Sequence, residues 1–183
     1  MLYKLILKDV VAVEPKYANT NTKEAVLASL KKEFLGYNDR NLGSIVEVID
    51  VLEVGVGKIM MEDSSIYFEV TFEAISFRPD NQEIVKGYVR DIVDFGVFLN
   101  IGAMDGMIHL SQTMADFVSF SQEKVIVGKD TKQTLKVGDI CIGKIIAISY
   151  RDINNPKIGL TMRQPYLGAL NWLKTDDELV KSE

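Results

Sequence analysis

The start of the chain alternates between apolar patterns that are typical of a strand and of a helix. Residues 2–13 are rich in β-favouring types with lysine and aspartate between them, and Pro15 ends this run. Apolar residues then recur at helical spacing over residues 25–35. Asn21 precedes them as an N-cap, and Gly36 follows as a C-terminal stop. The pattern predicts one strand followed by one amphipathic helix.

Two long strand-like runs follow the predicted helix, at residues 43–61 and 66–77. Gly55 and Gly57 allow the first run to bend or turn. Because side chains alternate along a strand, this run should place one set of residues on each face. The sets are Ile45, Glu47, Ile49 and Val51 on one face and Val46, Val48, Asp50 and Leu52 on the other. Strands and helix together predict a compact α+β sheet-and-helix domain over residues 1–78.

Residues 78–81, Arg-Pro-Asp-Asn, break both the strand and the helix patterns and mark a domain boundary. Five short strands are predicted beyond it, at residues 84–93, 97–101, 106–110, 139–150 and 157–163. A long connection, residues 111–138, has some helical character at residues 112–117. This order predicts a five-stranded antiparallel β-barrel of the Greek-key OB type over residues 79–165. Residues 166–183 are predicted to form a short helix and an acidic tail.

The composition excludes several classes of protein. No apolar run approaches the ~20 residues that a transmembrane helix needs. The apolar N-terminus is interrupted by Lys4, Lys8 and Asp9, which argues against a signal peptide. Cys141 is the only cysteine and fits a reducing environment. We therefore expect a cytoplasmic protein with no membrane association.

Residue types that carry chemistry are scarce. The chain has one histidine, His109, and one cysteine, so a zinc-type cluster cannot form. It also lacks the phosphate-loop, serine-elbow and dinucleotide-binding motifs. Carboxylate pairs such as Asp176-Asp177 are typical of a solvated surface. We expect neither catalytic activity nor a cofactor or metal.

The net charge of −5 argues against a protein that coats nucleic acid electrostatically. Residues 1–78 carry 9 Lys and Arg against 12 Asp and Glu, residues 79–165 carry 10 against 10, and residues 166–183 carry 2 against 4. A nucleic-acid contact is therefore expected in the neutral middle region, where it would depend on stacking as much as on charge.

A dense motif lies within the predicted barrel. Residues 87–111 read G-Y-V-R-D-I-V-D-F-G-V-F-L-N-I-G-A-M-D-G-M-I-H-L-S, and related strand patterns follow at residues 137–139 and 158–161. In residue type and spacing this stretch closely resembles the S1 RNA-binding domain. The matching positions are Gly87, Val89, Phe95, Gly96, Phe98, Gly102, Asp105, Gly106, His109 and Ser111.

Strand alternation supports this resemblance independently. On the second barrel strand the apolar residues Val97 and Leu99 share a face, which puts Phe98 on the other face. His109 takes the outward position on the neighbouring third strand, and Phe95 can join them at the strand entry. Exposed rings arranged in this way form a surface on which unpaired bases stack.

The candidate RNA-binding residues fall into two groups. They are Phe95, Phe98, His109 and Tyr88 for stacking and Lys86, Arg90, Lys144 and Arg163 for phosphate contacts. The same rings would also fit packing beneath residues 111–138 or contact with another protein, and these alternatives stay open.

Three further stretches of sequence show which kind of S1-containing protein this chain resembles. They are Y-K-L-I-L-K-D-V-V-A-V-E-P at residues 3–15, V-I-D-V-L-E-V-G-V-G-K at residues 48–58 and L-T-M-R-Q-P-Y-L-G at residues 160–168. Together with the order of the domains, these stretches resemble the E′-type stalk subunits of archaeal RNA polymerase. The resemblance extends over nearly the full length of the chain. The eukaryotic counterpart of these subunits is the seventh subunit of polymerase II. One departure is Ser64-Ser65 after Asp63, where a glycine-containing turn is expected.

The resemblance implies an RNP-like first domain that docks on the polymerase core near its clamp. It implies a heterodimer with the smaller stalk protein of the RNA polymerase, known as F, formed through the face between the two domains. The barrel would bind emerging single-stranded RNA and support open-complex formation and processivity, without chemistry of its own. The residues nearest the core would be Val54, Gly55, Val56, Gly57, Lys58, Asp63, Ser64 and Ser65.

Two other functions fit the same barrel. The acidic charge and the apolar content modestly favour a protein-interaction scaffold, which is compatible with a stalk. A translation or RNA-decay factor would also use such a barrel, although the first domain suits it less well.

Overall fold

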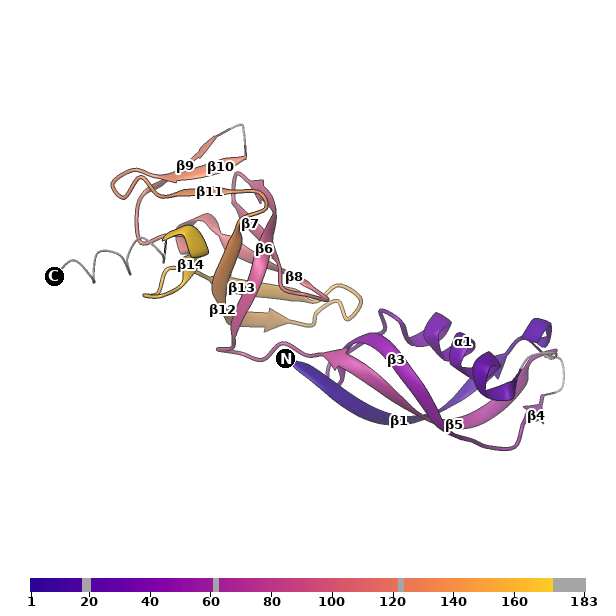
Figure 1. Cartoon of the computed structure of the whole chain (residues 1–183). Helices are drawn as coiled ribbons and strands as arrows, with labels where there is room; N and C mark the ends of the chain where they lie inside the picture. Colours follow the sequence, from indigo (N-terminus) through magenta and orange to yellow (C-terminus); the bar gives the residue numbers. More distant parts are fainter. Residues whose placement is uncertain (18–20, 61–62, 122–123, 173–183) are drawn as a thin grey trace. The chain divides into compact units, whose positions relative to one another are not determined.

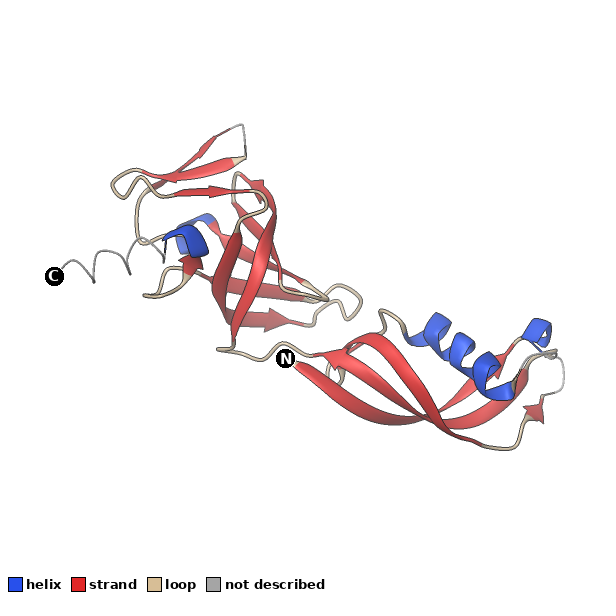
Figure 2. Ribbon diagram, viewed as in Figure 1, coloured by secondary structure: helices blue, strands red, loops and turns tan. Residues whose placement is uncertain are grey.

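A computed structural model describes residues 1–17, 21–60, 63–121 and 124–172 of the chain (Figure 1). The protein divides into two compact units, one formed by Met1–Arg78 and the other beginning at Pro79. Strands predominate in both units, and the long helix belongs to the first (Figure 2). The predicted α+β class is confirmed.

The first unit is an antiparallel sheet with one long helix on one face (Figure 1). Three long strands pair in the order β1-β5-β3, β2 extends the sheet beside β3, and β4 pairs with the start of β5. The bounds are β1 Leu2–Val13, α1 Thr22–Phe34, β2 Asn38–Asp39, β3 Gly43–Val54, β4 Lys58–Ile59 and β5 Ile66–Phe77, with a 3-10 turn at Pro15–Tyr17.

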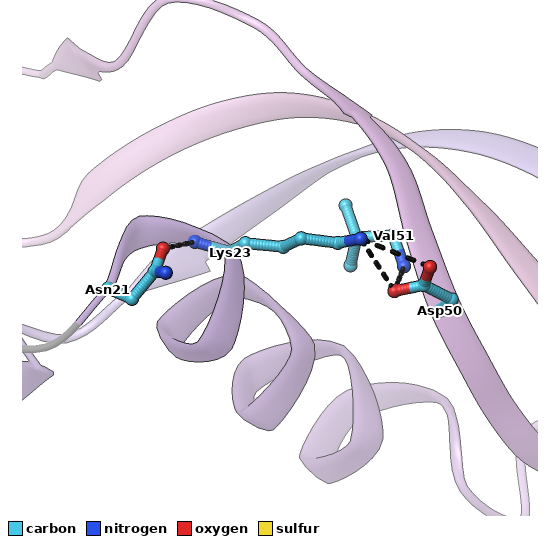
Figure 3. Close-up of polar contacts among 4 residues, drawn as sticks. All are labelled: Asn21, Lys23, Asp50 and Val51. Carbon is cyan, nitrogen blue, oxygen red and sulfur yellow. Dashed lines mark hydrogen bonds and ion pairs between the residues drawn. The ribbon is translucent and has the colours of Figure 1, made fainter.

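Helix α1 begins and ends where the sequence predicts. Asn21 Oδ1 accepts a hydrogen bond from Lys23 N at 3.1 Å, and Gly36 takes a positive φ of 77° just after the helix. The Lys23 ammonium reaches Asp50 on β3, at 2.9 and 3.0 Å from its two carboxylate oxygens (Figure 3). Asp50 also accepts from Val51 N at 2.8 Å. The ion pair between Lys23 and Asp50 fastens the N-terminal end of the helix to β3.

The simple alternation predicted for β3 is wrong. Its register with β5 shifts at three places, and at each one two β3 residues lie opposite one β5 residue. The inserted residues allow Glu47 and Asp50 to pair with Lys31 and Lys23 of the helix, at 2.7 and 2.9 Å. Burial therefore repeats every third residue: Ile45, Val48 and Val51 are buried beneath the helix, while Val46, Ile49 and Leu52 are exposed.

The second unit contains a closed barrel of five strands, as predicted. Strands β6, β7 and β8 follow one another, β8 pairs with β13, and β13 pairs with β12, which closes onto β6. The bounds are β6 Ile84–Val93, β7 Gly96–Asn100, β8 Asp105–His109, β12 Ile140–Ser149 and β13 Lys157–Thr161. Val97, Leu99, Ile108, Ile145 and Leu160 are at most 1% exposed and fill the interior.

One pairing differs from the predicted all-antiparallel barrel. Strands β8 and β13 run parallel, with Met107 opposite Gly159. A parallel pair needs a long crossover connection, and residues 110–156 between these two strands provide it.

The regular elements of the long connection after β8 are three short strands and one 3-10 turn, so the predicted helical character of residues 112–117 is wrong. A single 3-10 turn, η2 (Leu110–Gln112), ends where the Thr113 hydroxyl and N–H both donate to the Leu110 carbonyl, at 2.7 and 3.3 Å. The antiparallel strands that follow are β9 Val118–Ser121, β10 Val125–Gly128 and β11 Thr134–Lys136. Ile126 and Leu135 pair across this sheet and are fully buried, and that burial favours strands.

The sequence predicts a helix from residue 166 onward. A two-residue strand, β14 (Gly168–Ala169), pairs with β12 first, and a helix begins directly after it. The Trp172 indole N–H donates to the Thr134 carbonyl at 3.0 Å, which ties this segment to β11. The rest of the predicted helix and the acidic tail, residues 173–183, lie outside the described residues.

Candidate nucleic-acid interface

The aromatic side chains predicted to bind RNA come together on the outer surface of β7 and β8. The residues on either side of Phe98 along β7 are fully buried, so Phe98 points outward, and it is half-buried. In the β7–β8 pair, Phe98 lies opposite Met107 and Gly96 lies opposite His109. His109 is exposed. The outward orientation predicted for Phe98 and His109 is confirmed.

Phe95 stands at the entry of β7 and is 49% exposed. Its ring meets that of Phe98 edge to face, with centroids 6.4 Å apart and an interplanar angle of 87°. Its carbonyl accepts from Leu110 N at 3.0 Å, which ties it to the residue after His109. Such ring pairs contribute ~0.5–1.5 kcal/mol beyond area burial, so the two rings hold each other in place. Phe95, Phe98 and His109 form what we name the aromatic platform.

Gly96 allows the strands that carry the platform to lie close together. A Cβ at this position would lie only 2.4 Å from the Ile108 carbonyl oxygen. Any side chain at residue 96 would therefore push β7 away from β8. Close pairing of the strands, and not a turn, requires glycine here.

The His109 imidazole has a defined orientation. Its Nδ1 accepts a hydrogen bond from Ser111 N–H at 3.3 Å and lies 2.9 Å from Ser111 Oγ. An accepting Nδ1 leaves the proton of the neutral ring on Nε2. The ring can therefore stack on a base and also donate a hydrogen bond from the side away from the turn.

Tyr88 and Lys86 lie on β6, where they line a separate shallow cavity. Tyr88 pairs with Asn100, two residues along β7 from Phe98, and is 50% exposed. The cavity, of about 440 Å³, is also lined by Ile140 on β12. Tyr88 therefore extends the exposed aromatic surface along the barrel, and Lys86 is an exposed cation beside it.

The predicted phosphate-binding cations are not equivalent. The Arg90 guanidinium is paired with Asp105, whose other oxygen accepts from Asn100 Nδ2 at 2.9 Å, so its charge is already compensated. Lys144 is half-buried on β12, a strand that pairs with neither β7 nor β8. Arg163, by contrast, is exposed and lines a pocket together with the platform histidine.

One exposed aromatic residue beside this surface was not predicted from the sequence. Phe117, just before β9, is 78% exposed and lines the same pocket as His109 and Arg163. The helical interpretation of residues 112–117 obscured it. The available signal was an aromatic residue directly after an aspartate, Asp116.

The described parts of the chain contain no group of three or more His, Cys, Asp or Glu side chains that could hold a metal ion. Cys141 is fully buried in β12, and burial raises the pKa of its thiol to about 12. A thiolate is therefore not available at neutral pH. Within the described chain, no helix is both long and apolar enough to cross a membrane.

A second exposed surface lies in the first unit. Residues 54–60, which we name the tip segment, begin at the last residue of β3 and include β4. Val56 is 84% exposed and Ile59 is 74% exposed. Gly55 N–H donates to the Glu69 carbonyl at 2.8 Å, which holds the start of the segment against β5. The predicted core-docking residues of this segment, Val54, Gly55, Val56, Gly57 and Lys58, are all exposed.

Asp63 closes the turn before β5. Its Oδ1 accepts from Ser65 N at 2.9 Å, and its Oδ2 accepts from the Tyr67 hydroxyl at 2.5 Å. The hydrogen bond from Tyr67, followed by that from Ser65, lowers the pKa of Asp63. The side chain of Asp63 thus shapes the Ser64-Ser65 turn at the place where the resemblance predicts a glycine.

Comparison with known proteins gives a match for each unit. Residues 78–152 match the S1 RNA binding domain, and residues 8–65 match the SHS2 domain found in the N terminus of Rpb7p/Rpc25p/MJ0397. The DNA-directed RNA polymerase subunit Rpo7 of Saccharolobus shibatae is 32% identical over 175 residues, which cover 94% of this chain and 97% of that relative. This chain belongs to the Rpo7 family.

More distant relatives extend the Rpo7 match. Rpo7 of Sulfolobus acidocaldarius is 28% identical over 96% of this chain and 97% of its own length. The DNA-directed RNA polymerase V subunit 7 of Arabidopsis thaliana is 26% identical over 81% of this chain and 85% of its own length. The resemblance predicted from the motifs is confirmed, and the first unit, expected to be RNP-like, is an SHS2 domain.

Proposed function

We propose that this chain is a non-catalytic stalk subunit of a DNA-directed RNA polymerase that binds nascent single-stranded RNA on its aromatic platform. Rpo7 relatives are named as subunits of that polymerase, and they match this chain over nearly its whole length. Such a subunit partners with other polymerase subunits. A cytoplasmic location is part of the same proposal.

The aromatic platform is the observation that supports RNA binding most directly. Two phenylalanine rings and an imidazole gather on one barrel face. The surrounding region, residues 79–165, carries 10 Lys and Arg against 10 Asp and Glu, so charge attraction is weak. Stacking then supplies most of the affinity, at ~1–3 kcal/mol for each base. Because every base has a π-face, such a surface suits a protein that meets transcripts of any sequence.

We assign docking on the polymerase core to the tip segment and the turn of residues 63–65. Covering Val56 and Ile59 would stabilise the assembly by ~25 cal/mol for each Å² of apolar surface removed from water. The core-docking set is the one implied by the resemblance: Val54, Gly55, Val56, Gly57, Lys58, Asp63, Ser64 and Ser65. The smaller stalk protein of the RNA polymerase, F, is the proposed heterodimer partner.

Equilibrium binding tests the RNA-binding part of the proposal. A short fluorescent single-stranded RNA is titrated with the purified chain and its polymerase partner, and then with Phe98→Ala and His109→Ala. Loss of one stacked base corresponds to about 5- to 150-fold weaker binding. A log–log salt slope of only about −0.7 for each phosphate contact is expected. Unchanged affinity in both variants would show that RNA does not lie on the platform.

A pure protein scaffold is the competing function, and the exposed tip segment favours it. A scaffold would assemble with polymerase subunits but would retain no RNA at low salt. Pull-down from cell extract followed by mass spectrometry identifies the assembly. Recovery of ribosomal or exosome proteins without polymerase subunits would contradict the proposal.

A further inference from the structure

A pocket of about 490 Å³ opens beside the aromatic platform. One wall comes from the barrel, with His109 at the end of β8 and Arg163 just after β13. The other wall comes from the long connection, with Asp116 and Phe117 before β9 and Asp130 between β10 and β11. Small-molecule sites span roughly 300–1,000 Å³, so the pocket has room for one nucleotide.

Hydrogen bonds hold Arg163 next to His109. The Gln112 carbonyl in η2 accepts from Met162 N at 2.8 Å, and Gln112 Oε1 accepts from the Thr161 hydroxyl at 2.9 Å. The Thr161 hydroxyl oxygen in turn accepts from Arg163 N at 3.2 Å. The segment that carries Arg163 is therefore fastened to the turn that follows His109.

The Arg163 guanidinium is available to a ligand. Unlike the guanidinium of Arg90, it forms no ion pair with any residue in the described ranges. The planar guanidinium fork matches the oxygens of a phosphate and binds two of them at once. With His109 Nε2–H beside it, the barrel wall offers a phosphate N–H donors from two residues.

The pocket wall formed by the long connection is already held in place by hydrogen bonds before any ligand binds. The Asp116 carboxylate accepts from Asp130 N at 2.9 Å and from Thr131 N and Oγ1, each at 3.0 Å. The bond from the Thr131 backbone makes the largest contribution to lowering the pKa of Asp116. These bonds tie the residue before Phe117 to the β10–β11 turn, so the backbone that carries the exposed ring needs little ordering on binding.

We propose that this pocket holds one further nucleotide of the RNA strand that lies on the aromatic platform. Its base stacks on Phe117, and its phosphate is bound by the Arg163 guanidinium and His109 Nε2–H. The inference rests on the RNA-binding function proposed above. Because His109 belongs to both the platform and the pocket, the strand passes directly from one to the other.

The two carboxylates of the pocket orient the nucleotide. Asp116 and Asp130 belong to the wall formed by the long connection, where they repel a phosphate. The phosphate therefore lies at the barrel wall, and the base lies toward the connection. A carboxylate near the base accepts hydrogen bonds from exocyclic amino groups, so adenine, cytosine and guanine are favoured over uracil at this position.

Binding of RNA strands of increasing length tests the inference. The intact chain is titrated with single-stranded oligonucleotides of about 2 to about 8 nucleotides, which bracket the smallest site sizes of OB folds. Phe117→Ala should weaken binding about tenfold for strands long enough to enter the pocket and leave the shortest strands unaffected. Phe117→Tyr, which keeps the ring, should retain the affinity of the unaltered chain. Phe98→Ala should weaken binding at every length.

The phosphate contact has its own readout and a matched control. Arg163→Gln should reduce the magnitude of the log–log salt slope by about 0.7, the loss of one phosphate contact. Arg40→Gln, which removes the same charge from an exposed position in the first unit, should leave the slope unchanged. Replacing the nucleotide that enters the pocket by uridine should weaken binding to the intact pocket and not to the Asp130→Asn variant.

The outcomes separate this inference from the proposed function. If Phe117→Ala and Arg163→Gln bind RNA as the unaltered chain does while Phe98→Ala does not, the pocket is not a nucleotide site although the platform stands. If the unaltered chain retains no RNA at low salt, the proposed function itself fails. If the two pocket variants lose polymerase subunits and not RNA, the pocket is a protein contact, and the inference is overturned.

Discussion

Two of the apolar surfaces that the described residues expose differ in their chemistry. In the first unit the tip segment presents aliphatic side chains, with Val56 and Ile59 largely in solvent. In the second unit the platform presents the rings of Phe95, Phe98 and His109. An aliphatic side chain gains free energy only when it is covered, whereas a ring also offers a π-face to a base. Exposed apolar area alone therefore does not distinguish a proposed RNA-binding surface from a proposed docking surface, whereas the chemistry of the exposed side chains does.

The two surfaces also differ in how firmly they are held. The platform stands on fully paired strands, and two of its rings contact each other. After Val54, the last paired residue of β3, the tip segment is held by the two-residue strand β4 and by two backbone hydrogen bonds. Gly55 N–H donates to the Glu69 carbonyl, and Asp63 N–H donates to the Met60 carbonyl. A base gains most from a ring that is already in place, whereas an adaptable segment can still pack against a protein surface.

Of the changes considered, a charge introduced into the tip segment should cause the largest loss of affinity, and the loss should be in assembly with polymerase subunits. If a polymerase subunit covers Val56, Val56→Asp buries an uncompensated carboxylate at a cost of ~3–5 kcal/mol, which is about a hundredfold or more in assembly affinity. RNA affinity should not change. Reconstitution with polymerase subunits measures the first quantity, and fluorescence anisotropy measures the second. Ile153→Asp, at a half-exposed position of the second unit, is the control. If it weakened assembly as much as Val56→Asp does, the tip segment would not be a specific docking surface.

Replacing a platform ring by an aliphatic side chain separates stacking from simple apolar contact. Phe98→Leu keeps an apolar side chain but loses the π-face, so RNA binding should weaken by about 5- to 150-fold. Phe98→Trp keeps a π-face and should preserve most of the affinity. Both variants should assemble normally with polymerase subunits. Equal RNA affinity for leucine and phenylalanine would mean that the two surfaces do not differ in kind.

A cation beside the platform should contribute to RNA affinity only if it is not already paired with a carboxylate of the protein. Lys86→Gln should reduce the magnitude of the log–log salt slope for single-stranded RNA by about 0.7. Arg90→Gln should change the slope by much less, because its guanidinium is paired with Asp105. Titrations at several salt concentrations give both slopes. A larger change for Arg90→Gln than for Lys86→Gln would reverse this ranking.

Acidic pH should produce the smallest effect, a loss of folding stability in the first unit. Hydrogen bonds from Lys16 and Lys32 lower the pKa of Glu14 from 4.5 to about 2. The folded state therefore binds fewer protons than the unfolded state, so this stabilisation is complete above about pH 4.5 and is lost as the pH falls toward about 2. Glu14→Gln should lower the melting temperature less at acidic than at neutral pH, with RNA affinity unchanged. Identical shifts at both pH values would refute the assignment.

The platform could be predicted because each barrel strand has one buried face. Val97 and Leu99 had to point inward, so Phe98 had to point outward, and no distant residue alters that choice. The same reasoning failed for β3, because its bulges accompany ion pairs from Glu47 and Asp50 to helix α1. Contacts of that kind join residues far apart in the sequence and leave no mark on the local pattern.

The pocket could be predicted only in part, for a similar reason. His109 and Arg163 were both candidates, but the parallel pairing of β8 with β13 and the bonds through Gln112 bring them together. Phe117 was hidden because the strands of the connection form by pairing with each other and by burial of Ile126 and Leu135. The pairing of Arg90 with Asp105 arises next to a register shift in β6 and could not be foreseen.

His109 provides the most direct test, because it is the only histidine in the chain and its ring resonances need no assignment by mutation. Single-stranded RNA is added to the protein while the proton spectrum of that ring is followed. If bases lie on the platform, the ring current of a stacked base moves both ring C–H signals of His109 upfield. The RNA concentration dependence of this shift should give the same dissociation constant as fluorescence anisotropy does. Saturated RNA binding with His109 signals that do not move would contradict the account.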